Sequence, residues 1–112
     1  MRMAMIALLL AWGCSSDDGV SRELGARCDI TADCDERCLP PDADYPGGFC
    51  TVSCITTNEC PGSSSCADRE GGICLFDCFD DRDCTFLGDG WTCKETNARE
   101  QEGLKVKVCR GD

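Results

Sequence analysis

Thirteen cysteines in a chain of 112 residues are the side chains whose chemistry dominates this sequence. Cysteines pair as disulfides or bind metal ions as thiolates. One of them, Cys14, lies apart near the N-terminus. The other twelve are Cys28, Cys34, Cys38, Cys50, Cys54, Cys60, Cys66, Cys74, Cys78, Cys84, Cys93 and Cys109. This even set predicts six disulfides.

Zinc held by four cysteines at a time is the main alternative for the same residues. The closest cysteines are separated by three residues, at 34/38, 50/54 and 74/78. Zinc knuckles and thioredoxin-like redox sites rely instead on a two-residue separation. The N-terminus also carries an export signal, described below, and exported thiols oxidise. We therefore predict disulfides and no zinc.

The twelve cysteines form a threefold repeat with units at 28–50, 54–74 and 78–109. Five residues separate the first two cysteines of each unit, and an acidic residue precedes the second: Asp33, Glu59 and Asp83. The first two units end in Gly-Gly-Phe-Cys and Gly-Gly-Ile-Cys. Few large apolar residues accompany the cysteines, so covalent links must supply much of the stability. The sequence predicts a small disulfide-rich fold of three tandem four-cysteine units, mostly loops with short β-strands.

The spacing does not decide among the three disulfide pairings that four cysteines allow within a unit. We favour a bond from the first cysteine to the third and from the second to the fourth. Asp89-Gly90 predicts a turn. The alternation of apolar and basic residues over 104–108 predicts a strand, and 94–103 is expected to be a loop.

The N-terminal residues have the pattern of an export signal. Arg2 precedes an apolar run over 3–12 that is too short to span a bilayer and typical of a signal peptide. The segment Ala11-Trp12-Gly13-Cys14 resembles the bacterial lipoprotein signal, in which the cysteine thiol takes a diacylglycerol and becomes the new N-terminus. Because Cys14 is the unpaired thirteenth cysteine, we predict that it is acylated, after removal of residues 1–13. Ordinary secretion after cleavage at the same bond is the alternative.

The resemblance has consequences for location. Ser15 follows the cysteine, which in lipoproteins favours the outer membrane. The polar residues 14–27 are expected to be a flexible tether, and 110–112 a C-terminal tail. The tail spells Arg110-Gly111-Asp112, which we interpret as a coincidental match to the integrin-binding tripeptide.

Missing residue types exclude several functions. The chain has no histidine, which removes Ser-His-Asp and Cys-His sites, and its net charge of −10 disfavours binding to nucleic acid and to anionic lipid surfaces. The densest acidic cluster is Asp77, Asp80, Asp81 and Asp83, and its counterpart in the first unit is Asp33, Asp35 and Glu36. These carboxylates are candidate calcium ligands, although a solvated acidic surface without any cofactor is the interpretation we favour.

Aromatic residues are most frequent in the third unit and just before it: Phe76, Phe79, Phe86 and Trp91. We expect these rings in the core; an exposed patch for a protein or polysaccharide is the alternative.

The whole chain resembles the cysteine-rich lipoproteins of predatory and social soil bacteria, through its Cys-Ser-Ser start and its units of C-x5-C ending in Gly-Gly-aromatic-Cys. A weaker likeness is to the Dickkopf N-terminal and EGF-like modules. We expect a non-enzymatic envelope protein, anchored by lipid, that displays loops for recognition or adhesion. The alternatives are a secreted protease inhibitor, acting through Pro40-Pro41-Asp42 or Ser63-Ser64-Ser65, and a calcium-stabilised structural module.

Overall fold

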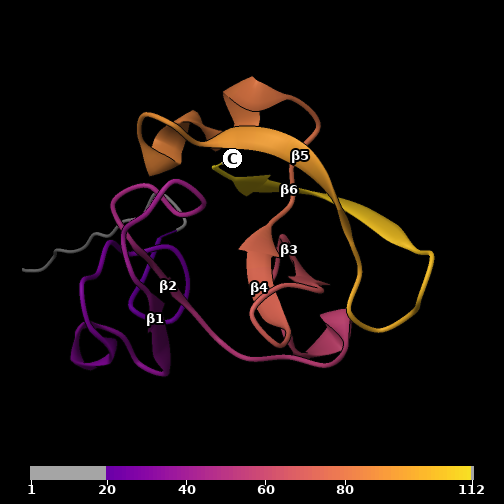
Figure 1. Cartoon of the computed structure of the whole chain (residues 1–112), viewed down its shortest axis with the longest axis horizontal. Helices are drawn as coiled ribbons and strands as arrows, with labels where there is room; N and C mark the ends of the chain where they lie inside the picture. The colour runs from indigo at the N-terminus through magenta and orange to yellow at the C-terminus, as the bar shows by residue number, and fades with distance from the viewer. Residues whose placement is uncertain (1–19, 112) are drawn as a thin grey trace, which may run out of the picture.

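Three short strand pairs, each belonging to one four-cysteine unit, make up the protein (Figure 1). The computed structural model describes residues 20–111. The signal peptide predicted at 1–13 and the acylation site predicted at Cys14 lie outside the described residues. The fold is small, rich in disulfides and built mostly of loops, as predicted from the cysteines.

Each unit has the same two parts, a 3-10 helix that begins between its first two cysteines and an antiparallel strand pair that carries the third and fourth; in the third unit the 3-10 helix continues past Cys84 to Leu87. The first unit contains η1 (Thr31–Asp33), β1 (Arg37–Leu39) and β2 (Phe49–Thr51). The second contains η2 (Thr57–Glu59), β3 (Ser64–Ala67) and β4 (Ile73–Phe76). The third contains η3 (Asp81–Leu87), β5 (Thr92–Asn97) and β6 (Lys105–Arg110).

Within each unit, the disulfides link the loop that contains the 3-10 helix covalently to the strand pair. All three units join the first cysteine to the third and the second to the fourth, which is the pairing favoured from the sequence. The bonds are Cys28–Cys38, Cys34–Cys50, Cys54–Cys66, Cys60–Cys74, Cys78–Cys93 and Cys84–Cys109. The third and fourth cysteines face each other across the strands, as Cys38↔Cys50, Cys66↔Cys74 and Cys93↔Cys109. The two disulfides of a unit therefore leave neighbouring strand positions and pack side by side.

The glycine pair that closes the first two units allows a close approach of two backbone segments. Gly48 and Gly72 have φ angles of 82° and 108°, which disfavour any residue with a side chain. A Cβ on Gly48 would overlap the carbonyl oxygen of Cys28, and one on Gly72 would overlap that of Cys54. The strand pair can thus lie directly against the first cysteine of its own unit.

The three units share one core. Its largest fully buried side chains include Phe49, Ile73, Leu75 and Val108, which come from all three strand pairs. The Thr51 hydroxyl in β2 donates to the carbonyl of Cys74 in β4 at 2.6 Å. Because no unit buries these residues alone, the chain folds as one domain with an internal repeat.

Trp91 joins the third unit to the first. It is 4% exposed, and its ring lies 5.1 Å from that of Phe49 and 6.5 Å from that of Tyr45. The indole N–H donates to the carbonyl of Pro46 at 3.0 Å. The turn predicted at Asp89-Gly90 precedes it in the structure.

The tether predicted over 14–27 is wrong for residues 20–27, which belong to the folded domain. Leu24 is 2% exposed within the shared core. The backbone N–H of Gly25 donates to the carbonyl of Cys50, and that of Cys50 donates to Ala26, both at 2.8 Å. Burial of one leucine and pairing with β2 are sufficient to hold this polar segment in place.

The predicted loop at 94–103 is also partly wrong, because its first four residues continue β5. Cross-strand pairing extends from Thr92↔Arg110 to Asn97↔Lys105. The strand expected at 104–108 is present as β6. Long-range pairing with β6 thus determines the conformation of a segment whose own sequence carries no strand pattern.

Candidate binding site

The first loop of every unit is held by the acidic residue that precedes the second cysteine. The Asp83 carboxylate accepts hydrogen bonds from the backbone N–H groups of Phe79 and Asp80, at 2.7 and 3.1 Å. Asp33 accepts from Asp29 and Ile30 in the same way, at 2.9 and 3.3 Å. The repeated acid therefore satisfies backbone donors at the start of a 3-10 turn, as acidic residues do at helix N-termini.

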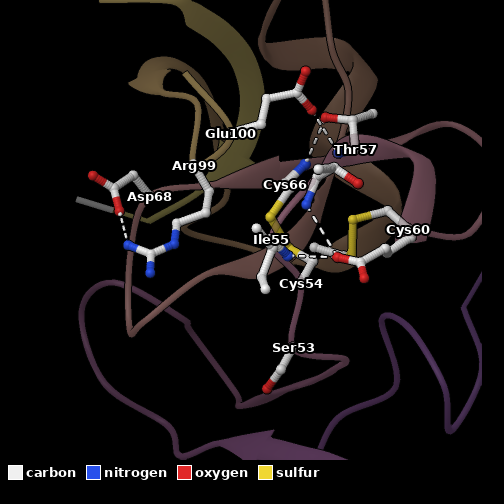
Figure 2. The surroundings of a disulfide bond; sticks show 12 residues. Ser53, Cys54, Ile55, Thr57, Cys60, Cys66, Asp68, Arg99 and Glu100 are labelled. Carbon is white, nitrogen blue, oxygen red and sulfur yellow. Dashed lines mark hydrogen bonds and ion pairs between the residues drawn. A yellow bond between two sulfur atoms is a disulfide. The ribbon is translucent and has the colours of Figure 1, made fainter. Parts of the chain in front are cut away.

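The second unit has the same arrangement, and Figure 2 shows its surroundings, with Ile55, Thr57 and Glu100 labelled. The carboxylate of Glu59 accepts from the backbone N–H groups of Ile55 and Thr56, at 2.6 and 3.1 Å. A second carboxylate, on Glu100 of the third unit, accepts from the backbone of Thr57 at 2.7 Å. Near it, Arg99 pairs with Asp68 at 3.1 Å, so charged side chains of the third unit hold the second unit's loop and strand end.

These hydrogen bonds give the protein a defined dependence on pH. Backbone donors lower the pKa of Asp33, Glu59 and Asp83 below the ordinary carboxyl value. The bonds therefore stabilise the fold fully above the unfolded pKa of about 4, and the stabilisation is lost as the pH falls through the lowered folded pKa. We expect D33N/E59Q/D83N to melt lower than the wild type at pH 7 and to lose less stability between pH 5 and pH 2.

Thermal unfolding followed by circular dichroism across that pH range measures the effect. The variant E23Q/E95Q/E102Q is the matched control, because it removes the same charge at exposed carboxylates. Melting curves of the two triple variants that fall in parallel with pH would contradict the capping role.

The four carboxylates considered for calcium serve separate partners. Asp77 accepts from the Ser65 hydroxyl at 2.5 Å, and Asp81 accepts from the backbone N–H of Cys93 at 2.9 Å. Asp80 accepts from the backbone and the guanidinium of Arg82, at 3.0 and 3.2 Å. Asp83 holds its two backbone donors. In the first unit, Asp35 pairs with Arg22 and Glu36 accepts from Ser53.

Within residues 20–111, the only groups of three or more ligand-type residues whose ligand atoms converge are cysteines, and those cysteines are bonded as disulfides. Because calcium prefers six to eight oxygen ligands around one point, we expect it to contribute little here. The melting temperatures with excess calcium and with a chelator should coincide. A calcium-dependent rise in melting temperature, lost in D80N/D81N and kept in D35N/E36Q, would instead assign a site to the third unit.

Each of these fixed loops presents one large apolar side chain to solvent. Ile30 is 61% exposed, Ile55 is 66% exposed and Phe79 is 87% exposed. Ile55 and Phe79 occupy the same place in their units, directly after the first cysteine. The backbone N–H of each donates inward to the capping acid, so the side chain is directed away from the core.

The prediction that Phe76, Phe79, Phe86 and Trp91 all pack in the core is right for Phe76 and Trp91, which are 7% and 4% exposed. It is wrong for Phe79 and Phe86, and Phe86 is 43% exposed. Phe86 lies near the end of η3, and its ring forms a T-shaped pair with the Phe76 ring, with 5.2 Å between the two centroids. The alternative, an exposed aromatic surface, therefore applies to these two residues.

Phe79 borders a surface hollow of about 700 Å³. Its walls come from β3, the start of the third unit and β6, and consist of Ser63, Ser65, Asp77, Cys78, Phe79, Asp83, Val106 and Lys107. The ammonium group of Lys107 donates to the carbonyl of Phe79 at 2.7 Å, which fixes this wall against β6. We call this hollow, with the Phe79 ring, the Phe79 groove.

The loops proposed for a protease inhibitor differ in accessibility. Pro40, Pro41 and Asp42 are exposed after β1, and the Asp42 carboxylate accepts from the backbone of Asp44 and Tyr45 at 2.8 and 3.1 Å. In the serine run only Ser63 is exposed. Ser64 and Ser65 are buried in β3, so Ser63-Ser64-Ser65 is not the exposed loop that the sequence suggested.

The C-terminal Arg110-Gly111 is part of the fold, and the predicted free tail is wrong for these two residues. Arg110 ends β6, and its guanidinium donates to the Thr96 hydroxyl at 3.0 Å. The backbone N–H of Gly111, a buried residue, donates to the carbonyl of Asp44 at 2.7 Å. Asp112 lies outside the described residues. A tripeptide with two members held in this way does not have the exposed loop that integrin ligands present.

Sequence reasoning did not assign Val106 and Lys107 to a site. Their alternation correctly predicts a strand with one apolar face and one basic face. The sequence does not show which segment lies beside this strand. Ser63 and Lys107 line the same groove although 44 positions separate them in the chain. For the acidic positions a signal was available: an acid three residues after Thr56, Asp80 or Ile30 has the spacing of a capping box.

Comparison of the chain with protein families, with curated protein sequences and with solved structures gave no match. No helix within residues 20–111 is long and apolar enough to cross a membrane.

Proposed function

We propose that the mature chain is a non-enzymatic binding protein of the bacterial cell envelope, anchored by lipid on Cys14, which recognises a protein or polysaccharide through the Phe79 groove. The observation that carries the proposal is the exposure of Phe79, at 87%, on a loop held by the Asp83 carboxylate. An exposed aromatic ring beside a hollow is the kind of surface that dominates binding energy at protein interfaces. The loop is already rigid, so little entropy is lost on binding.

The anchor is tested by the intact mass of the protein purified from its own membrane. We expect the mass of a chain beginning at Cys14 with added acyl groups, and a gain of twelve hydrogen atoms on reduction, two for each of the six disulfides. A C14S variant should lose the acyl mass and leave the membrane fraction. A mature wild-type chain without acyl groups would contradict the anchor and favour secretion.

The groove is tested with ligands selected from peptide and glycan libraries on the folded wild-type domain. We expect the selected ligands to lose at least about tenfold in affinity for F79A, as at a binding hot spot. They should retain their affinity for I55A, which removes the equivalent exposed side chain in the second unit. Ligands that bind F79A as tightly as the wild type would contradict the groove as the binding surface.

A protease inhibitor is the second candidate, because the exposed Pro40-Pro41-Asp42 loop is fixed by the Asp42 carboxylate. A rigid exposed loop can occupy the active site of a protease and be cleaved only slowly. Inhibition of any member of a panel of proteases, lost in P41A/D42A and kept in F79A, would favour this function over the first.

A further inference from the structure

A second apolar surface lies at the start of the described chain and is formed by residues other than those that line the Phe79 groove. Val20 is 38% exposed and Phe86 is 43% exposed. The Phe76 ring lies between them: it meets Phe86 edge-on at 5.2 Å, and it approaches Gly25 at the same point as the Val20 side chain. We call this strip, with the hollow beside it, the Val20–Phe86 face.

The hollow has a volume of about 390 Å³ and shares no wall residue with the Phe79 groove. It is lined by Val20, Gly25, Ala26, Arg27, Thr85, Phe86, Leu87 and Gly88. These residues include the exposed cation Arg27 and no carboxylate, on a chain whose net charge is −10. An apolar surface with a cation and without acids is complementary to an anionic lipid bilayer.

Chain length sets how far this face can lie from the anchor. Because residues 20–27 belong to the domain, only six peptide links separate Val20 from Cys14. Fully extended, they span at most about 22 Å. That limit holds for any conformation of the intervening residues. A bilayer that holds acyl chains on Cys14 must therefore lie within this distance of Val20.

We infer that the Val20–Phe86 face rests on the bilayer, so that the domain lies on the membrane in a fixed orientation and the residues of the Phe79 groove take no part in this contact. The inference rests on the proposed acylation of Cys14. The anchor keeps the face near the lipid, so even a weak apolar and electrostatic contact is populated. The short chain to the proposed anchor therefore favours the bilayer as the partner, and Arg27 gives this face a local cation on an acidic protein.

Lipid-quenching fluorescence tests the orientation. The acylated protein, purified from membranes with F86W or F79W, is reconstituted into vesicles of phosphatidylethanolamine and phosphatidylglycerol with or without brominated acyl chains. Trp91 is buried and common to both variants, so wild-type emission is subtracted. We expect the brominated lipid to quench the added emission of F86W about twofold, because such a face penetrates the boundary of the acyl chains. The F79W emission should change little.

V20W probes the same face and keeps the test valid if F86W does not fold. Vesicle flotation and intact mass are measured on the same samples. Protein that floats with its acyl mass, but shows equal quenching or none at the two faces, would overturn the inference and leave the anchor intact. Protein that lacks acyl groups and does not float would remove the anchor and the inference together. Self-association that shields F86W without lipid would assign the face to a second copy and also overturn the inference.

Discussion

Replacing Trp91 with alanine is expected to lower the free energy of unfolding by about 3–5 kcal/mol, the range for large aromatic residues in cores. Trp91 is 4% exposed, and its ring contacts Phe49 and Tyr45 of the first unit. The change also leaves the carbonyl of Pro46 without its indole donor, which adds the cost of an unmade hydrogen bond. Disulfides within single units cannot replace this contact between units.

Calorimetry is the suitable measurement, because W91A removes the tryptophan that a fluorescence assay would follow. The melting temperature should fall by at least about 12 °C, at roughly 4–8 °C for each kcal/mol in a domain of this size. W91F separates the two contributions, since it keeps an aromatic ring and loses only the donor and part of the packing. F79A is the control, because Phe79 is 87% exposed and buries nothing in the core. Equal melting temperatures for W91A and F79A would show that the units fold independently.

The architecture of each unit was accessible from the sequence because the constraints on it are local and repeated. An even set of cysteines, one acidic position and a glycine pair recur at fixed spacing, and they correspond to six disulfides, three capped turns and two close backbone approaches. The strand at 104–108 and the turn at Asp89-Gly90 also follow from local patterns. Each of these features depends on residues within one unit.

The arrangement of the units was not accessible, because it depends on contacts with no local pattern. Leu24 is a lone leucine in a polar segment, and only the shared core explains its burial. Glu100 reaches a backbone N–H on Thr57 across 43 residues. No local sequence pattern distinguishes Trp91, which is buried in the core, from Phe79, which is exposed. The composition shows that large apolar residues are few. It does not show which of them become buried against another unit.

That division also explains why the exposed apolar surfaces were only partly predicted. The sequence identified the aromatic residues and gave an exposed patch as the alternative to a core. The Phe79 groove needs β3 and β6 to meet, and the Val20–Phe86 face needs residues 20–27 to fold back onto the domain. Both surfaces therefore arise between segments that are distant in the chain, where an internal repeat gives no information.

Removal of a single disulfide is expected to lower the free energy of unfolding by an amount that depends on the unit. C84A/C109A opens a link between residues 25 apart, whereas C28A/C38A opens one between residues 10 apart. Restriction of the unfolded chain predicts losses of about 3.5 and about 2.7 kcal/mol for the two. Burial widens the difference, because Cys84 and Cys109 are fully buried whereas Cys28 and Cys38 are 5% and 9% exposed.

Urea unfolding of the oxidised variants measures both losses on one scale. We expect C84A/C109A to be the less stable variant, with the whole domain unfolding in one transition, because β6 supplies Val108 to the core shared by all three units. C28A/C38A should unfold at a higher urea concentration, since the disulfide that this variant lacks joins only the η1 loop to β1. Two separate transitions in C84A/C109A, with the first two units unfolding like the wild type, would contradict the shared core and make the repeat a chain of independent modules.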